Sequence, residues 1–245
     1  MIRIQRVDLD ETLNLRLNSR TARLIDRSAD AKSARRSWKG ATNERKGLKQ
    51  ALSGMAAGIE RCMYCGDSRG TDIDHFEPIA KAPFRTFEWH NHTLACTSCN
   101  SNEKRDSYPC AEDGSPLLIN PTAEEPSDHL DLLLSVGEYE GITIKGSATI
   151  RVFQLNRKDL AIGRANAFIR CKSMLRDYIM LESKGRTEEA VATQLALKQL
   201  PFVDVLFAMY RTIDLPGAAT VLGGPEILRL LTRWHSEDTQ NNDSD

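Results

Sequence analysis

Apolar residues recur at helical spacing near the start of the chain. The recurrence involves Leu13, Leu17, Leu24 and Ile25, and it predicts a helix from Leu9 to about Arg27. A second helix is predicted from about Asn43 to Ile59. Both helices precede the part of the chain that carries most of its cysteines.

The middle of the chain loses this helical period. Glycine and proline interrupt it at Gly66, Gly70, Pro78, Pro83, Pro109, Gly114 and Pro116, which is typical of short strands and turns. Residues 142–146 and 149–152 then alternate between apolar and polar side chains. That alternation predicts a β-hairpin that closes the middle region.

From Asn156 onward the pattern is helical again. Asn156 is expected to cap a long helix that Gly185 ends, and Thr187–Leu200 is the next predicted helix. An apolar helical face follows over 202–213, and Pro225 opens a last helix. The acidic, polar segment 236–245 is expected to be disordered. We therefore predict a helical arm (1–61), a middle domain (62–155), a C-terminal helical domain (156–235) and a tail (236–245).

Composition and charge refine this picture. The 245 residues are 40% hydrophobic, which is enough for a packed core. No apolar run approaches the roughly 20 residues of a membrane span, and the start of the chain does not resemble a secretory signal, so we expect a cytoplasmic protein without a membrane segment. The net charge of -1 argues against a nucleic-acid partner until its distribution is considered.

Residues 1–61 contain 14 Lys and Arg against 7 Asp and Glu, whereas the remainder contains 19 against 27. A basic arm of this kind could follow a phosphate backbone. The alternative, that its cations only solvate helix faces, stays open. The cations concerned are Arg35, Arg36, Arg45, Lys46 and Lys49.

Four cysteines form two Cys-x-x-Cys pairs, Cys62 with Cys65 and Cys96 with Cys99. Each pair can present two thiolates from one tight turn, so together they predict a tetrahedral zinc site. Thirty residues separate the two pairs, more than in a usual zinc ribbon, which is explained if a catalytic strand and loop are inserted between them. Four thiolates leave no open position, so this zinc would be structural. A redox role is the rival interpretation for either pair alone. Cys110 and Cys171 have no such partner.

Between the pairs lies Asp74-His75. Neighbours on a strand point to opposite faces, so a metal-binding carboxylate and an imidazole base can sit side by side. A hard cation such as Mg²⁺ prefers oxygen, and the amide of Asn100 could reach the same ion. The alternative without a catalytic role is that the Asp-His pair caps a turn or lies on the surface. Asp72 and Glu77 are weaker candidates, and for His90 and His92 we favour structural or surface roles.

Together these residues resemble an HNH endonuclease of the ββα-metal type in its zinc-ribbon form. The resemblance rests on the two cysteine pairs, Asp74-His75, Asn91 and Asn100. It implies an α+β protein with a small ββα-metal core and a four-cysteine zinc site, flanked by N-terminal helices and a C-terminal helical domain.

The resemblance also implies a role for each residue. Asp74 and Asn100 would bind a catalytic Mg²⁺ or Mn²⁺, His75 would be the general base, and Asn91 would tie the loop between the two strands. Histidine often stands where this chain has Asn100, and its absence favours Mg²⁺ over softer ions. Lys104 and Arg105 could hold a phosphate, or form a solvated helix end.

A weaker similarity extends over most of the chain. It rests on residues 2–6, the Asp-His-Phe-x-Pro form of the motif, 87–91, 118–121 and 152–157, and it is to the PtuB family, the HNH component of Septu anti-phage systems and of certain retron systems. This similarity implies an ABC-type ATPase partner (PtuA-like), which the 156–235 helices could dock. Those helices could equally pack only on themselves.

We expect a nucleic-acid substrate, DNA in the first place, although the residues do not distinguish DNA from RNA. The competing hypothesis is a non-catalytic zinc module that binds nucleic acid or protein.

Overall fold

The structure is a computed structural model that describes the backbone of residues 1–242 and the side chains of residues 1–237. It is an α+β protein, as the sequence predicted, and its described part contains two small two-stranded sheets. Its elements in chain order are α1 (Glu11–Asp26), α2 (Ala31–Lys39), α3 (Thr42–Met55), β1 (Asp72–His75), η1 (Pro83–Arg85), η2 (Trp89–Asn91), β2 (His92–Ala95), η3 (Ser98–Lys104), η4 (Pro126–Asp128), β3 (Leu130–Leu133), β4 (Glu138–Gly141), α4 (Ile144–Phe153), α5 (Lys158–Ser183), α6 (Thr187–Gln199), α7 (Asp204–Thr212), α8 (Ala218–Leu222) and α9 (Pro225–Asn242).

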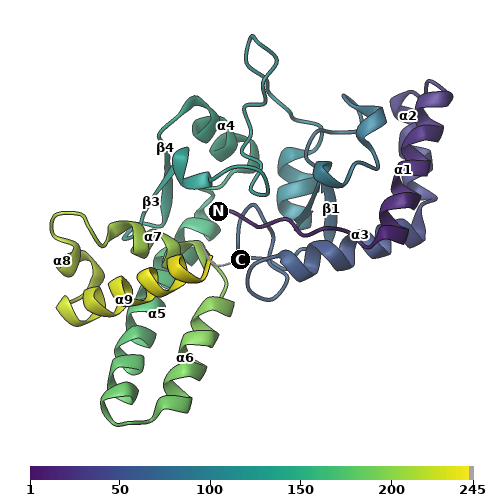
Figure 1. Cartoon of the computed structure of the whole chain (residues 1–245). Coiled ribbons are helices and arrows are strands. Elements are labelled where there is room, and N and C mark those ends of the chain that lie inside the picture. The colour runs from purple at the N-terminus through teal and green to yellow at the C-terminus, as the bar shows by residue number, and fades with distance from the viewer. Residues whose placement is uncertain (243–245) are drawn as a thin grey trace. The chain divides into compact units, whose positions relative to one another are not determined.

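The chain divides into two compact units (Figure 1). Unit 1 comprises Met1–Leu130 and Glu140–Leu155, and unit 2 comprises Asp131–Tyr139 and the chain from Asn156 onward. All the candidate site residues lie in unit 1.

Three helices open unit 1. The side chains of Asp10 and Asp30 cap α1 and α2 by accepting hydrogen bonds from backbone N–H groups in the first turn. The predictions of α1 and α3 are confirmed, although α3 ends at Met55 and not at the predicted Ile59. The sequence missed α2, because Ala34 is its one buried residue and no apolar period can be read from it.

The N-terminal helices share a core with the loop between β1 and β2. Leu17, Leu24 and Leu48 are buried there together with Phe87 and Ile79, which come from that loop. Figure 1 shows α3 leading from the region of α1 and α2 toward β1. The basic helices are therefore part of the body that carries the site.

The two strands β1 and β2 pair antiparallel, with Asp74 opposite Thr93 and His75 opposite His92. The first cysteine pair joins this sheet through Met63, whose N–H donates to the Leu94 carbonyl at 2.9 Å. A turn of π-helix, η3, follows β2 and includes Cys99 of the second cysteine pair. Sheet and helical turn together form the expected ββα arrangement.

The predicted hairpin over 142–152 is wrong, because this segment forms the helix α4. Its β-branched residues favour a strand locally, but the buried positions Thr149 and Phe153 are four residues apart and define a helical face. Thr143 caps the helix by accepting from Gly146 N–H at 3.0 Å. A Cβ on Gly146 would lie 1.9 Å from the His129 carbonyl oxygen, so this close approach requires glycine.

Unit 2 is mostly helical, and Figure 1 shows α5 and α6 side by side as an antiparallel pair. The predicted helices of this region are confirmed, and Gly185, at φ +70°, makes the turn after α5. Asn156 does not cap α5; its side chain bonds the backbone N–H and carbonyl of Tyr139 at 2.8 Å each.

The C-terminal tail is helical further than predicted. Helix α9 continues to Asn242, so the disorder predicted from Ser236 is wrong that far, and residues 243–245 lie outside the described part. No single helix in the described chain is long and apolar enough to cross a membrane. Taken together, α6 and α7 are apolar enough, but they bend by 107° at their junction.

Candidate active site and metal centre

The four paired cysteines converge on one point. Their sulfur atoms all lie within 4.8 Å of one another, and all four residues are buried. Four thiolates around a tetrahedral zinc, with Zn–S bonds of about 2.3 Å, would lie about 3.8 Å apart, and the Cys65 and Cys96 sulfurs are 3.9 Å apart. The donor set and its spacing therefore fit a zinc ion.

Cys110 and Cys171 take no part in this group. Cys110 is exposed and Cys171 is buried in α5. All six cysteines are free thiols, so no disulfide competes with the metal site.

The side chain of His75 is buried in unit 1 and held by one backbone carbonyl. Its Nε2 lies 3.0 Å from the Thr86 oxygen, and Nε2 of His92 lies 3.0 Å from the same oxygen. Because a carbonyl oxygen only accepts, both Nε2 atoms must carry their protons. Nδ1 of His75 is then the nitrogen that can accept a proton.

Burial keeps both imidazoles neutral. It lowers the pKa of His75 to about 4, against the opposing effect of the Thr86 carbonyl. The pKa of His92 is lowered well below its usual range, mainly by burial and to a smaller extent by the neighbouring His75. Within the described structure the Nδ1 of His92 is buried and has no hydrogen-bond partner. At neutral pH, therefore, His75 is in the form that a general base requires.

Trp38 of α2 covers this histidine pair. Its ring meets His75 edge-on at 4.5 Å and stacks on His92 at 5.2 Å, while the guanidinium of Arg45 lies 5.5 Å from the Trp38 ring. Trp38 was not predicted as a site residue, because α2 itself was not predicted.

Asn91 fixes the loop that brings Thr86 to the histidines. Its amide nitrogen donates to the carbonyls of Glu77 and Arg85 at 3.0 and 3.2 Å, and its side-chain oxygen accepts from Glu77 N–H at 2.8 Å. Its own carbonyl accepts from Phe76 N–H at 2.8 Å. Only 1% of the Asn91 surface is exposed, so its contacts are with the protein, and the loop-tying role that the resemblance implied stays a prediction.

Asp74 points to the other face of β1, into a closed polar cluster. One carboxylate oxygen accepts from the Tyr64 hydroxyl at 2.6 Å, and the other accepts from the Lys104 ammonium at 3.0 Å. The Tyr64 oxygen lies 2.7 Å from the hydroxyl of Thr93, which must donate to it because Tyr64 donates to Asp74. Burial raises the pKa of Asp74, opposed by Lys104 and Tyr64.

This cluster does not fit a cation shared by Asp74 and Asn100. Asp74 is only 3% exposed and both of its oxygens are occupied. The amide nitrogen of Asn100 instead lies 3.4 Å from a carboxylate oxygen of Asp72. We therefore assign no chemical step to a cation between Asp74 and Asn100.

The prediction that Lys104 holds a phosphate needs correction. Lys104 is 0% exposed, and its ammonium also donates to the His75 carbonyl at 2.6 Å. The helical turn buries this residue because η3 packs against α4. Arg105 does lie at the surface, at φ +50°, where its Nε donates to the Asn102 carbonyl.

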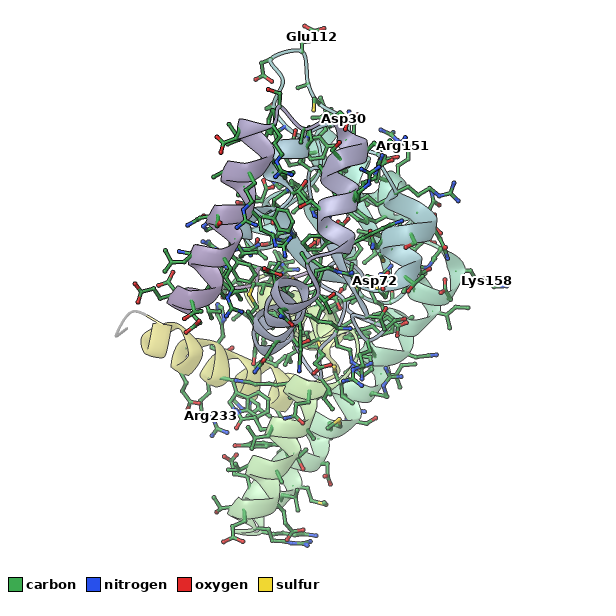
Figure 2. The ribbon with its side chains drawn as sticks, turned by 90° about the vertical axis from the view of Figure 1, so that its right-hand side faces the viewer. Asp30, Asp72, Glu112, Arg151, Lys158 and Arg233 are labelled. Carbon is green, nitrogen blue, oxygen red and sulfur yellow. The ribbon has the colours of Figure 1, made fainter. Side chains whose placement is uncertain are left out.

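Asp72 and Asn100 line a cavity of about 520 Å³ together with cations of α3. Figure 2 labels Asp72 near the C-terminal end of α2, the helix that begins after Asp30. The other lining residues are Trp38, Thr42, Arg45, Lys46, Lys49, Thr71, Ile73 and Ser101. A basic cavity thus opens beside the strand that carries His75.

Comparison with known proteins agrees with this geometry. Residues 62–106 match the family model described as HNH endonuclease, which confirms the resemblance over the segment that contains both cysteine pairs and Asp74-His75. No solved structure matches the chain.

Two curated relatives are both named Septu protein PtuB. The one from Bacillus thuringiensis is 28% identical over 117 residues, which cover 46% of this chain and 42% of the relative. The one from Bacillus mycoides (strain KBAB4) is 24% identical over 148 residues, which cover 48% of this chain and 50% of the relative. The chain therefore spans half the length of these relatives or less.

The first prediction concerns the cysteine site. Cys96→Ser should lower both the zinc content of the purified protein and its thermal unfolding temperature, because a structural metal contributes directly to folding. Metal analysis and thermal unfolding measure the two effects. Cys110→Ser, a change at an exposed cysteine, is the matched control and should alter neither. A Cys96→Ser protein that is as stable as the wild type without zinc would refute the site.

The second prediction concerns pH. The pKa of His75 is about 4 in the folded chain, against 6.5 for an unperturbed histidine, so between these values the unfolded chain binds a proton that the folded chain does not. The free energy of unfolding should therefore fall as pH drops from 6.5 toward 4, by about 3 kcal/mol at most for this residue.

Urea unfolding between pH 5 and 8, with zinc content monitored, measures this dependence. His75→Gln should make it shallower and leave the part that the buried His92 contributes, whereas His90→Gln, at an exposed histidine, should leave it unchanged. An unchanged slope in His75→Gln would show that the histidine is not held neutral by burial.

Proposed function

We propose that this chain is a cytoplasmic, metal-dependent endonuclease that hydrolyses phosphodiester bonds of nucleic acid, with DNA as the expected substrate. The observation that carries the proposal is His75, which burial keeps neutral and the Thr86 carbonyl holds in one tautomer, within a segment that matches the HNH endonuclease family.

The proposed reaction is hydrolysis. Nδ1 of His75 takes a proton from water while the water oxygen attacks phosphorus, and the bond from phosphorus to the leaving oxygen breaks. The Thr86 carbonyl keeps Nε2–H in place, and Asn91 holds the loop that carries Thr86. Thr86 and Asn91 are positioning residues because neither has to touch the substrate.

Two metals are proposed, with separate duties. Zinc on the four cysteines would hold the frame, because a four-thiolate site has no open position. A divalent cation, Mg²⁺ or Mn²⁺, would neutralise charge on the phosphate and the leaving oxygen. The ligands predicted for that cation from the resemblance were Asp74 and Asn100.

The basic cavity is the proposed path of the nucleic-acid backbone. Arg45 and Lys46 are exposed on α3, and Lys49 reaches the Thr71 carbonyl at 2.6 Å, so three cations line the wall nearest β1. Arg35 is less available, because it pairs with Asp106 at 3.0 Å. Phosphate contacts of this kind position a backbone without reading its sequence.

The biological setting follows from the similarity to Septu PtuB. We propose that the chain is the nuclease effector of a bacterial anti-phage complex, and that its partner is an ABC-type ATPase (PtuA-like). The C-terminal helical domain is the proposed docking part. Helix α5 supports this choice, because Ile162 and Ile169 are 49% and 59% exposed along it.

The third prediction tests catalysis. His75→Ala should abolish magnesium- or manganese-dependent cleavage, by 10²-fold or more, while zinc content stays at the wild-type level. Gel assays on plasmid DNA and on RNA measure cleavage and identify the substrate. His90→Ala is the matched control and should cleave normally. Retained cleavage in His75→Ala would remove His75 as the base.

The fourth prediction tests the partner. Co-expression with a PtuA-like ABC-type ATPase should give a complex that co-elutes in size-exclusion chromatography. Ile169→Asp on α5 should weaken it, whereas Ile25→Asp on α1, where the side chain is 55% exposed, should not. A monomer that is fully active alone and does not bind the ATPase would contradict the proposed complex.

A further inference from the structure

Helix α1 and the residue that caps its C-terminus carry a row of arginines along one face. Arg16, Arg20, Arg23 and Arg27 are four, three and four residues apart. At 3.6 residues per turn they lie within about 60° of one another around the helix, and at 1.5 Å per residue the row is about 16 Å long. Arg20 is half-buried and the other three are exposed. None of them lines the basic cavity beside β1.

The row does not stabilise the helix that carries it. Like charges four residues apart on a helix repel, and the row contains two such pairs, Arg16 with Arg20 and Arg23 with Arg27. Arg20 has a counter-charge, because it donates to both carboxylate oxygens of Glu44 at 2.9 and 3.2 Å. In the described chain no carboxylate lies within ion-pair distance of the other three arginines. A bound anion would relieve this repulsion.

Helix α2 faces the row across a cavity of about 390 Å³, which we call the arginine cavity. The chain reaches α2 through a Schellman turn, in which Ser28 N–H donates to the Ile25 carbonyl at 2.8 Å and Ala29 N–H donates to the Leu24 carbonyl at 2.9 Å. Leu24 and Ala29 are buried in the lining, and α2 contributes Arg36. The other lining residues are Arg20, Arg23, Arg27, Ser33 and Ser37.

The lining has the chemistry of a phosphate site. It offers four guanidinium groups and two hydroxyl groups, and it contains no carboxylate. A guanidinium can donate two parallel hydrogen bonds to one phosphate, which an ammonium cannot do. The lining also contains no aromatic ring on which a base could stack. The cavity would therefore recognise phosphate and not a base.

The length of the row favours a chain of phosphates over a single one. A neighbouring cavity of about 330 Å³ is lined by Arg16, and it shares Arg20 and Arg23 with the arginine cavity. Glu44 also lines this second cavity, where it offsets part of the positive charge. One phosphate group would meet only part of a row about 16 Å long, whereas a nucleic-acid backbone could follow all of it.

The arginine cavity is separate from the histidine site. Ser33 and Arg36 of α2 line the arginine cavity, whereas Trp38 lines the basic cavity beside β1 and contacts His75. At about 100° per residue, Trp38 lies about 140° around the helix from Ser33. Two different faces of α2 thus border the two basic cavities, and a ligand in the arginine cavity is not in contact with the proposed base.

We propose that the arginine cavity is a second contact for the phosphate backbone of a nucleic acid, which holds the substrate at a distance from the reacting bond. The proposal rests on the proposed function, since it adds a substrate-binding site to that nuclease. Arg23, Arg27 and Arg36 carry the contact, because Arg20 is already paired with Glu44. Phosphate is common to DNA and RNA, so this contact adds affinity without reading sequence.

The test is fluorescence anisotropy of labelled duplexes of about 30 base pairs, about 100 Å long at 3.4 Å per pair. One duplex is DNA and the other is RNA, and the full-length, zinc-loaded protein is titrated over a salt series without added Mg²⁺ or Mn²⁺. Combining Arg23→Gln, Arg27→Gln and Arg36→Gln should weaken binding tenfold or more. For the DNA duplex, the slope of log affinity against log salt should become shallower by about 3.

The matched control removes the same charge elsewhere. It combines Arg151→Gln, Arg170→Gln and Arg229→Gln, three exposed arginines of α4, α5 and α9. Affinity for both duplexes should stay within about threefold of the wild type, because charges outside the contact act only weakly through the salt solution. Equal weakening in the control and in the glutamine variant of the cavity would show an effect of net charge alone and would overturn the site.

A lysine variant separates charge from geometry. With lysine at positions 23, 27 and 36 the salt slope should stay near that of the wild type, while part of the affinity is lost with the bidentate hydrogen bonds. A lysine variant with the shallow slope of the glutamine variant would contradict the phosphate contact. Thermal unfolding of the glutamine variant should occur at the wild-type temperature or above, because repulsion in the row is relieved.

The two duplexes and inorganic phosphate identify the ligand. Weakened binding of one duplex only would assign the contact to that nucleic acid. Calorimetric titration with inorganic phosphate tests the small anion. If the glutamine variant loses binding of inorganic phosphate but keeps the wild-type affinity for both duplexes, the cavity takes free anions only and the inference fails. It also fails if the wild type binds neither duplex.

Cleavage by the same proteins distinguishes this inference from the proposed function. The glutamine variant should raise KM and leave kcat within about twofold of the wild type, because its residues do not touch the reacting atoms. A wild type that cleaves, with unchanged duplex binding in the glutamine variant, refutes the site and keeps the nuclease. A wild type that binds through these arginines and never cleaves keeps the site and refutes the nuclease.

Discussion

Antiparallel pairing of β1 with β2 sends Asp74 and His75, neighbours in the chain, to opposite faces of one small sheet. The rest of the site depends on this separation. On one face Asp74 binds the cysteine turn and η3 through Tyr64 and Lys104. On the other face His75 meets Trp38 and the Thr86 carbonyl. The strand is thereby fixed from both sides, and the imidazole it carries has one orientation.

Burial acts differently on the two faces. A carboxylate and an ammonium tolerate burial together, because each supplies the opposite charge that the other lost with its water shell. Two imidazoles side by side have no such counter-charge and remain neutral, sharing one carbonyl. The ionic face is therefore suited to holding the structure, and the neutral face to accepting a proton. Asp72 and Asn100 are partly exposed and border the basic cavity.

Much of the fold could be predicted from periodicity. Helices α1, α3, α5, α6 and α9 were found because their apolar residues repeat at helical spacing over many turns. Helix α4 was mistaken for a hairpin, because β-branched residues alternate in it and its buried face contacts residues distant in sequence. Helix α2 was missed because Ala34 is its one buried residue, so its apolar residues show no helical period. Its contact with the site is made by a single side chain, Trp38, which stacks on His92.

The sequence by itself determined the four-cysteine cluster, the pair Asp74-His75 and the HNH character of residues 62–106, because these depend on residue type and short spacing. It could not assign Lys104, Asp72, Tyr64 or Trp38. Whether Lys104 meets a phosphate or a buried carboxylate depends on one π turn and on what packs over it. Burial and the choice of partner arise from contacts between segments far apart in the chain. Only the tertiary structure could decide that Asp74 is enclosed and Asp72 accessible.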